Sequence, residues 1–391
     1  MKKILFLTYV NPYTLLAGDR IYTVNILKSL IDFGYSIDLL YYNSEPSQPL
    51  IPEQQSKFFN RHLALDFNRK SNLKLVFSCY PGMVTSRRTS SYLKQIRDWT
   101  RNKKYDVAII NHLRMGFCLE ALPSSVKKIY VSHNAEYLLS LNNYRNESNG
   151  IKKLVYAWDA MRTRLYEQKL LKNINGYTAI CENDLRYLKG IKMVSSALLR
   201  PVLNGAEGKL NSKEDFFENI KKMIVVGSFT WGPKAQNIKA LVRSFVENQM
   251  VSEGFELHVV GRIEDHLAIQ LKRICPDIYI TGQVVNLEKF YSKCSIALIP
   301  EIMGGGFKLK VAEAGMFKKA IFSVQGAITK SNLKPQSHFN ESKDLDELML
   351  NLIESVKNPE ELWRMAVSAH EVVNTEYTQE ALSKSLKRIL T

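Results

Sequence analysis

Apolar segments rich in β-branched residues recur along this chain at intervals long enough to hold a helix. The series is interrupted by a stretch of proline, glycine and small polar residues (198–216), after which the pattern restarts. Regular alternation of strands with helices is typical of α/β domains built on a parallel sheet. The strand candidates are 2–10, 36–42, 73–78, 105–111, 127–133 and 176–181, then 221–228, 255–261, 278–282, 295–300 and 320–324.

Two α/β domains of similar plan therefore account for the 391 residues, which exceed one typical core. We place the boundary near Pro201, which gives domains 1–200 and 201–375. The tail is helical in pattern, with Asn358-Pro359 as a start signal, and we expect 376–391 to return toward the first domain. Ligands of open α/β sheets bind beyond the carboxyl ends of the strands, so functional residues are expected in the loops there.

The net charge of +16 is concentrated in the first domain. Residues 1–200 hold 30 Lys and Arg against 15 Asp and Glu, whereas the remainder holds 24 against 23. This asymmetry suggests that the first half faces an anionic partner, such as a membrane surface, a charged glycan or nucleic acid. A soluble surface rich in lysine is the alternative.

The cysteines and the apolar runs indicate the compartment. The five cysteines are scattered and form no CxxC pair, which fits a reducing cytosol and mostly buried thiols. No apolar run approaches the roughly 20 residues of a membrane helix, and the first segment lacks the features of a signal peptide. We therefore expect a cytoplasmic protein.

A triple-glycine loop precedes a helix in the second half. Gly304, Gly305 and Gly306 let the backbone come close to a ligand, and the helix that follows offers unpaired N–H groups. Lys308 and Lys310 lie in its first turn, where the helix dipole favours anions. They are explained as extra charge for a dianionic group such as a pyrophosphate. A flexible turn with two solvated lysines is the alternative.

Glu313 lies on an otherwise apolar stripe of the same helix, with Leu309, Met316 and Ala320. A carboxylate there needs a partner or a function. It could accept hydrogen bonds from both ribose hydroxyls of a nucleotide while the loop holds the phosphates, or it could form a buried ion pair with a lysine. The loop lacks GxxxxGK[ST] and the first strand lacks GxGxxG, which disfavours ATPase and dehydrogenase functions.

With these residues, the chain resembles the retaining, nucleotide-sugar-dependent glycosyltransferases of the GT-B fold, in family four. The resemblance covers nearly the whole chain and is strongest over 223–324; PEIMGGGFKLKVAEAGMFKKAIFS is similar to the family's Pro, glycine loop, Leu-Glu-Ala helix and strand. It implies two Rossmann-like domains that face each other across a cleft, with the C-terminal helix packing back on the N-terminal domain. It also implies that Glu313 binds the donor ribose.

The loop after the first strand of the second half carries the next part of the resemblance. VVGSFTWGPKAQNIKAL (225–241) is similar to the family's first strand, loop and helix of the donor domain. Lys234 takes the place of a lysine that clamps the diphosphate, whereas Ser228 stands where an arginine is usual. The family's paired glutamates are eight apart, and the first falls at Gly305, so recognition of the sugar hydroxyls departs from the pattern.

The first half resembles the family more loosely. LLAGDRIYTVNILKSLIDFGYSIDLLYY is similar to its glycine loop, helix and second strand, which places Gly18 near the donor phosphates or the acceptor. VSHNAEY looks like a strand-end His-Asn-x-Glu segment, which places His133 near the reacting sugar, although a structural histidine is the alternative. In the second half, Arg262 would lie beside the base or at the surface.

The resemblance implies a metal-independent hexosyltransferase that moves a sugar from a nucleotide diphosphate sugar to an acceptor hydroxyl with retention. UDP and GDP sugars are favoured as donors, and no cofactor or metal is expected. Lys234, Lys308, Lys310 and the Gly305–Phe307 backbone would stabilise the departing diphosphate, with Lys308 and His133 as catalytic candidates. The alternatives are a degenerate sugar-nucleotide binder and a nucleic-acid-binding protein, although no nucleic-acid motif is present.

The acceptor is expected to be a glycan or a lipid-linked sugar, in the synthesis of polysaccharide or lipid-linked glycan. Segments 87–104 and 152–172 mix Arg and Lys with Trp and Tyr, as in helices that lie on anionic lipid. Taken alone, the spacing of Tyr92, Ile96 and Trp99 is more often that of a core face. We expect a peripheral enzyme that contacts anionic membrane through residues 1–200 and binds no nucleic acid.

Overall fold

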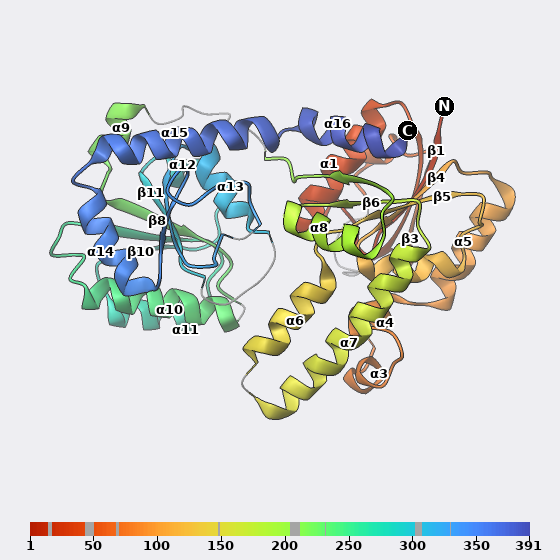
Figure 1. Cartoon of the computed structure of the whole chain (residues 1–391), viewed down its shortest axis with the longest axis horizontal. Coiled ribbons are helices and arrows are strands. Elements are labelled where there is room, and N and C mark those ends of the chain that lie inside the picture. Colours follow the sequence, from red (N-terminus) through yellow and green to blue (C-terminus); the bar gives the residue numbers. More distant parts are fainter. Residues whose placement is uncertain are drawn as a thin grey trace. The chain divides into compact units, whose positions relative to one another are not determined.

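The computed structural model describes residues 1–14, 18–43, 51–67, 70–147, 149–203, 212–230, 232–301, 307–328 and 330–391. They form two units (Figure 1): unit 1 is Met1–Val202 with Gln379–Thr391, and unit 2 is Leu203–Thr378. The sequence placed the corresponding boundaries after residues 200 and 375. Each unit is an α/β domain with its own parallel sheet.

Unit 1 is built on a seven-stranded sheet in the order β3-β2-β1-β4-β5-β6-β7. Every strand pair is parallel, for example Ile4 opposite Ile37 in β1 and β2. This is the order of a Rossmann-like domain, with its switch point between β1 and β4. The strands are β1 (Lys3–Leu7), β2 (Ser36–Asn43), β3 (Arg61–Asp66), β4 (Val107–Asn111), β5 (Lys127–Val131), β6 (Gly176–Ala179) and β7 (Ser195–Leu198).

The helices of unit 1 include one from the C-terminal end of the chain. Helix α16 packs on α1 and β7, where Gln379 donates a hydrogen bond to the carbonyl of Asn25 at 2.9 Å. The expected return of the last helix is confirmed. The helices are α1 (Gly18–Asp32), α2 (Glu53–Ser56), α3 (Asn72–Val76), α4 (Gly82–Arg87), α5 (Ser90–Asn102), the 3-10 helix η1 (Leu113–Glu120), α6 (Glu136–Asn146), α7 (Gly150–Lys172), α8 (Glu182–Ile191) and α16 (Gln379–Leu390).

One strand prediction is wrong. The segment 73–78 is mostly helix α3, whose N-cap Ser71 accepts a hydrogen bond from the Lys74 amide. Its apolar side chains face outward, with Leu73 71% and Phe77 81% exposed, so they do not form the buried stripe of a sheet strand. The third strand is instead β3, which pairs with β2.

Helix α5 shows which of two interpretations of segment 87–104 holds. Tyr92, Ile96 and Trp99 are all buried, and they pack with residues of β1, β2 and β4 in one hydrophobic cluster. The expectation that this apolar face lies on a membrane is therefore wrong, and the core interpretation is confirmed. Burial of these side chains anchors α5 to its sheet.

Unit 2 repeats the plan with six parallel strands in the order β10-β9-β8-β11-β12-β13. The strands are β8 (Lys222–Val226), β9 (Glu256–Val260), β10 (Tyr279–Thr281), β11 (Ile296–Ile299), β12 (Ala320–Val324) and β13 (Asn340–Ser342). The helices are α9 (Lys213–Glu218), α10 (Gly232–Glu247), α11 (Asp265–Ile274), α12 (Glu288–Tyr291), α13 (Leu309–Met316), α14 (Leu345–Ser355) and α15 (Pro359–Glu376).

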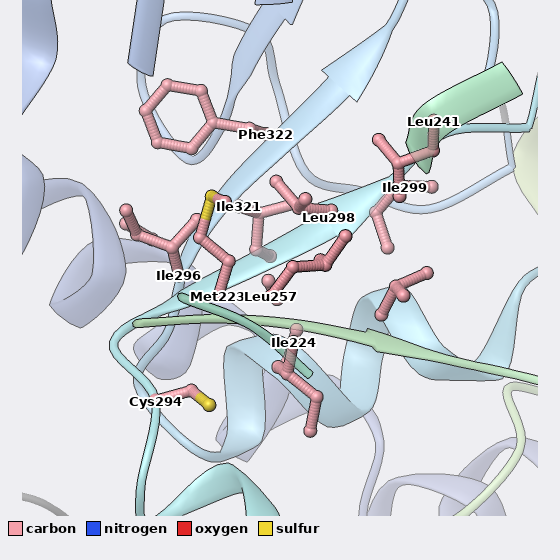
Figure 2. Packing of buried hydrophobic residues seen from close by; sticks show 14 of the residues in the cluster. Met223, Ile224, Leu241, Leu257, Cys294, Ile296, Leu298, Ile299, Ile321 and Phe322 are labelled. Atoms are coloured by element: carbon pink, nitrogen blue, oxygen red, sulfur yellow. The ribbon is translucent and has the colours of Figure 1, made fainter. Parts of the chain in front are cut away.

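The core of unit 2 lies around its central strands (Figure 2). Every residue of β11 is buried, because helices cover both faces of a parallel sheet. Side chains of β8, β11 and β12 pack together there, including Met223, Ile224, Leu298 and Phe322. This core fixes the strand ends from which the loops of the site depart.

Candidate functional site

The candidate site in unit 2 lies at the carboxyl edge of the sheet, around its switch point. Strands β8 and β11 are neighbours there, and both run into loops that lead to helices. Ligands of such sheets bind at this position. The predicted residues Gly304, Gly305 and Gly306 lie outside the described residues, whereas Phe307, Lys308, Lys310 and Glu313 lie within them.

Lys310 forms an ion pair with Glu301, the residue that follows Pro300 at the end of β11. Both side chains are largely withdrawn from water, with exposed fractions of 14% and 7%. Burial lowers the pKa of Lys310, and the charge of Glu301 opposes this. The pair connects the strand end to the first turn of α13.

Lys308 is the N-cap of α13, and its Nζ donates a hydrogen bond to the carbonyl of Ala327 at 2.6 Å. Burial lowers the pKa of Lys308 to about 8; Glu301 opposes the shift, while Lys310 and Lys234 add to it. Lys234 on α10 thus lies close enough to act electrostatically on both other lysines. The fold thus brings Lys234 close to two lysines that lie more than 70 residues further along the sequence.

Glu313 lies one turn further along α13, and its side chain is half-buried. Burial raises the pKa of Glu313 to about 7, and the charge of Lys310 opposes the rise. Among the described residues, no side chain or amide donates a hydrogen bond to this carboxylate, because Lys310 pairs with Glu301 instead. The alternative of a simple Glu313–lysine ion pair is therefore not what the structure contains.

The remaining predicted residues of unit 2 lie around the same edge. Phe307 stacks on Tyr377 with ring centroids 5.8 Å apart. Ser228 follows β8, is exposed, and shares a hydrogen bond of 3.2 Å with Thr230. The backbone carbonyl of Arg262 accepts a hydrogen bond from the Phe229 amide at 2.7 Å, while its side chain is exposed.

Gly261 explains how the loops after β8 and β9 come so close. Its φ is +128°, and a Cβ at this position would lie 1.9 Å from the carbonyl oxygen of Gly227. No other residue type fits that space without moving the backbone. The two glycines therefore hold Ser228 and Arg262 side by side at the edge of the sheet.

In unit 1, His133 follows β5 and is buried beneath the carboxyl edge. Its Nε2 lies 2.8 Å from Oδ1 of Asn111, and the Asn111 amide donates to the hydroxyls of Thr8 and Thr23. Asn Oδ1 must then be an acceptor, so Nε2 carries the proton. Burial lowers the pKa of His133 to about 4, and the ring is neutral at neutral pH.

His112 was not singled out from the sequence, although it lies beside His133 with ring centroids 5.0 Å apart. It is the residue directly after β4, and the rule that selected His133 applies to it equally. Its φ of 81° is rare for a residue with a side chain and costs about 1–3 kcal/mol, a strain that clusters at functional sites. Its Nε2 lies 3.4 Å from Glu136 Oε1.

Glu167, a second buried acid, stabilises the loop beside this histidine pair. Glu167 accepts hydrogen bonds from the amides of Glu136 at 2.9 Å and Tyr137 at 3.4 Å, at the start of α6. Burial raises the pKa of Glu167 to about 8. The contact fixes the loop that carries His133 and Glu136.

Gly18 is the first residue of α1, and no heavy atom of the described residues lies within 4 Å of the Cβ position there. Next to it, Asp19 accepts a hydrogen bond from the hydroxyl of Tyr9, which follows β1. The predicted residues thus form two groups, one at the carboxyl edge of each sheet. Gly18 and His133 belong to unit 1, and the other described candidates belong to unit 2.

Comparison with known protein families gives a match within unit 2, which holds the second group of residues. Residues 220–352 match the family described as Glycosyl transferases group 1. No curated protein sequence is significantly similar to the chain.

Solved structures with the same fold span the whole chain. Sucrose-phosphate synthase from Thermosynechococcus elongatus superposes with a TM-score of 0.73 at 13% identity, covering 100% of this chain and 98% of the other. HepE of Anabaena in complex with UDP gives 0.67 at 11% identity, with coverages of 100% and 99%. A mutant of S. aureus TarM in complex with Fondaparinux, alpha-GlcNAc-glycerol and UDP gives 0.67 at 11% identity and 100% coverage of both chains.

The fold of the chain is therefore GT-B, as the resemblance implied. Both units have the Rossmann-like strand order of that fold, and the domain match includes the loop, Lys308, Lys310 and Glu313. The partial family match and the fold together support glycosyl transfer. Within the described part of the chain, no helix is long and apolar enough to cross a membrane.

Proposed function

We propose that the chain transfers a sugar from a nucleotide diphosphate sugar to an acceptor hydroxyl with retention of configuration. The observation that carries this proposal is Glu313. Its carboxylate is half-buried without a described hydrogen-bond donor, in a segment that matches the group 1 glycosyltransferases, and Lys310, one of three neighbouring lysines, acts on it electrostatically. Two ribose hydroxyls would supply the missing donors, and the lysines would supply charge for a diphosphate.

In the proposed reaction, the bond between the sugar C1 and the diphosphate oxygen breaks, and a bond from C1 to the acceptor oxygen forms on the same face. The acceptor hydroxyl proton passes to the departing phosphate. Negative charge develops on that phosphate, so the fixed cations Lys234, Lys308 and Lys310 lower the barrier. The pKa of Lys308, near 8, keeps it mostly protonated at neutral pH.

His133 is proposed to orient the sugar or the acceptor rather than to transfer a proton. Its low pKa makes the imidazolium a costly state, and Nε2–H is committed to Asn111. Nδ1 has no hydrogen-bond partner among the described residues and can accept from a substrate hydroxyl. Replacing His133 by Asn should therefore lower kcat without creating a new pH dependence near pH 6.

Thermal unfolding of the full chain with UDP, GDP or ADP, and with their glucose conjugates, tests the donor site. A ligand at 100 times its dissociation constant adds about 2.7 kcal/mol to stability. We expect UDP or GDP to raise Tm in the wild type, Glu313→Gln to abolish the shift, and Lys308→Gln to weaken it. Glu371→Gln, at an exposed site on α15, is the matched control.

Turnover separates an enzyme from a degenerate binder. Release of nucleoside diphosphate from the preferred donor, measured with and without acceptor sugars, should be detectable in the wild type and lost in Lys308→Gln. Donor binding without any release would favour the degenerate binder. Salt-dependent binding of oligonucleotides, with no response to any nucleotide sugar, would favour the nucleic-acid alternative.

The acceptor is proposed to be a glycan or lipid-linked sugar at an anionic membrane, on which unit 1 would dock from the cytoplasm. Helix α7 supports this proposal, because it carries an exposed apolar stripe at spacings of three and four residues. Its exposed fractions run from 43% at Trp158 to 78% at Ile151. The stripe consists of Ile151, Leu154, Trp158, Met161 and Leu165.

Neighbouring residues extend this stripe into one amphipathic surface. The Trp158 indole donates a hydrogen bond to the Val76 carbonyl at 3.1 Å, which holds α3 beside α7. Leu73 and Phe77 are exposed there together with Lys74, and Lys152 and Arg164 are exposed on α7. Figure 1 shows α6 and α7 extending beyond the strands of unit 1. Basic and apolar side chains in such an arrangement fit anionic lipid better than a second, equally basic copy of the helix.

Co-sedimentation with phosphatidylcholine vesicles, with and without phosphatidylglycerol, tests the membrane surface. The double variant Leu154→Ser/Met161→Ser should lose binding to the anionic vesicles. Ile269→Ser, which removes an exposed apolar side chain from α11 of unit 2, should bind as the wild type does. Dimerisation through α7 without lipid, measured by analytical ultracentrifugation and lost in the double variant, would refute the membrane role.

A further inference from the structure

Two arginines lie at the carboxyl edge of the unit 1 sheet, beside the histidine pair. Arg87 is the last residue of α4, and Arg114 lies in η1, two residues after His112. The amide of Arg114 donates to Nδ1 of His112 at 3.2 Å. The loops after β1, β4 and β5 converge here at the switch point, where Rossmann-like sheets hold their ligands.

The two guanidinium groups approach the same aromatic ring. Arg114 Cζ lies 5.0 Å and Arg87 Cζ 5.9 Å from the ring centroid of Tyr9. Arg87 is also stacked on Phe67 at 3.6 Å. Stacking leaves the edges of a guanidinium, and with them its N–H donors, available for an acceptor in the plane.

In the part of the chain that the structure describes, no protein group occupies those donors. Neither guanidinium forms an ion pair or a side-chain hydrogen bond with a described residue, and the Nε atoms of both arginines are buried without a partner there. Buried donors in folded proteins are nearly always paired. Two like charges with unused donors thus lie close together, and burial followed by the charge of Arg114 lowers the pKa of Arg87 to about 10.

Other arginines of unit 1 show what a structural role looks like. Arg61 is bonded to Asp38 at 2.6 Å and also to Tyr105. Arg162 is bonded to Asp159 and to the carbonyls of residues 75, 76 and 78. Both also stack on a tryptophan, so aromatic stacking does not by itself leave an arginine without acceptors.

The nearby acids are already engaged. Asp19 accepts from the Tyr9 hydroxyl, and Glu136 faces Nε2 of His112. Among the described residues, neither acid is seen in an ion pair with Arg87 or Arg114. The electrostatic influence of Arg114 reaches both His112 and His133, so this positive pair borders the proposed reaction site.

We propose that Arg87 and Arg114 bind an anionic group, a phosphate or a carboxylate, of the acceptor. This inference rests on the proposed function, since it places the acid beside the histidines where the acceptor hydroxyl would react. Guanidinium forks match both kinds of anion with paired hydrogen bonds. The acceptor is accordingly an acidic sugar or a sugar carried on a phosphate, and a neutral sugar is a poor substrate.

Thermal unfolding in inorganic phosphate, against chloride at the same ionic strength, tests the site in the full chain. The arginine substitutions are made in the Lys308→Gln variant, because this variant is expected to bind phosphate weakly in unit 2. We expect phosphate to raise Tm, and Arg87→Gln or Arg114→Gln to lower the apparent affinity about tenfold or more. Arg97→Gln, at an exposed position on α5, should respond as its parent does.

The unfolding temperature without phosphate provides a second readout. Because each substitution removes one of two repelling cations, Arg87→Gln and Arg114→Gln should keep or raise the Tm of the parent. A structural arginine would behave in the opposite way. Large destabilisation by both substitutions overturns the proposal.

Two further probes identify the source of the anion. Glucuronate represents an acidic sugar, and dihexanoyl phosphatidate below its micellar concentration represents a phosphate on lipid. The site is supported if at least one of the three anions stabilises the parent protein and both arginine variants lose that stabilisation. The proposal is overturned if no anion has this effect. UDP binding in the arginine variants is a separate control, because its persistence would leave the donor proposal intact when the acceptor inference fails.

Discussion

Two carboxylates, one fully buried in unit 1 and one half-buried in unit 2, are surrounded in opposite ways. Asp38 in β2 is fully buried and accepts hydrogen bonds from four side chains. The four hydrogen bonds outweigh the effect of burial and lower the pKa of Asp38. The donors are Asn60, Arg61, Lys103 and Tyr105. Glu313 has no such donors among the described residues, and burial raises its pKa to about 7.

Under the proposed function, the difference is that between a structural charge and a ligand-binding one. Asp38 lies near the amino end of its strand, where the fold itself supplies the partners, whereas Glu313 lies near the carboxyl edge, where a ligand would supply them. A buried charge that the protein leaves unpaired costs stability. Such a loss of stability is expected at a binding site, where the bound ligand offsets it.

The largest expected effect is the loss of stability when Asp38, the paired carboxylate, is replaced. Asp38→Asn removes the common partner of Arg61 and Lys103 and should lower the free energy of unfolding by about 3 kcal/mol, measured by urea denaturation at pH 7. Because folding lowers the pKa of Asp38, its contribution is present above about pH 4 and is lost as the pH falls further. The stabilities of variant and wild type should then converge in acid.

Asp66→Asn, at the exposed end of β3, provides the matched control for this experiment. It should leave stability within about 0.5 kcal/mol of the wild type. UDP binding should survive in both variants. A stable Asp38→Asn protein would mean that the described hydrogen bonds contribute little, and the comparison would fail.

Lys319 tests whether every unpaired buried charge is functional. It is fully buried at the amino edge of the unit 2 sheet, and its Nζ has no hydrogen-bond partner among the described residues. No ligand is expected at that edge, so Lys319→Met should raise the free energy of unfolding by about 1–2 kcal/mol and leave UDP binding unchanged. Lys293→Met, at an exposed neighbouring position, should do neither.

The pH dependence of the Lys319 effect has a definite sign. Burial lowers its pKa to about 7 from 10.5, so the unfolded chain binds more protons between these values. Its contribution to stability therefore improves as the pH rises through that window. The advantage of Lys319→Met should be largest near pH 7 and should shrink toward pH 10. Loss of UDP binding would show that Lys319 serves the site after all.

The smallest effect on stability is expected at Glu313. Its folded pKa is raised, so the carboxyl contributes stability below about pH 4.5 that is lost as the pH rises through about 7. Glu313→Gln should be more stable than the wild type at pH 8, by about 1 kcal/mol or less because solvent screens this half-buried carboxyl, and the difference should shrink toward pH 5. Lower stability of the variant at pH 8 would indicate a structural partner for Glu313.

Regular periodicity made much of the fold predictable. The alternating apolar segments specified parallel sheets, and the restart at residue 221 specified a second domain. Segment 73–78 failed because an apolar run of that length fits a helix as well as a strand, and its burial is not encoded locally. The five free cysteines follow the expectation, with Cys79 exposed and the other four buried.

The candidate site was predictable only in part. Lys308, Lys310 and Glu313 were found because they follow a glycine loop within one short segment. His112 directly follows a strand, the same feature that pointed to His133, but it was missed. Arg87 and Arg114 carry no local pattern, because 27 residues separate them and their meeting at Tyr9 depends on the packing of α4 against η1.

The sequence by itself determined the elements, their alternation and the charge that each segment carries, because these depend on residues close together in the chain. Only the tertiary structure decided which charges are paired. Lys310 meets Glu301 and not Glu313, and Asp38 gathers partners from β3 and from the segment before β4. Desolvation and pairing act over a few ångströms in space, whatever the separation in sequence, so the energetic meaning of a charged residue is fixed by the fold.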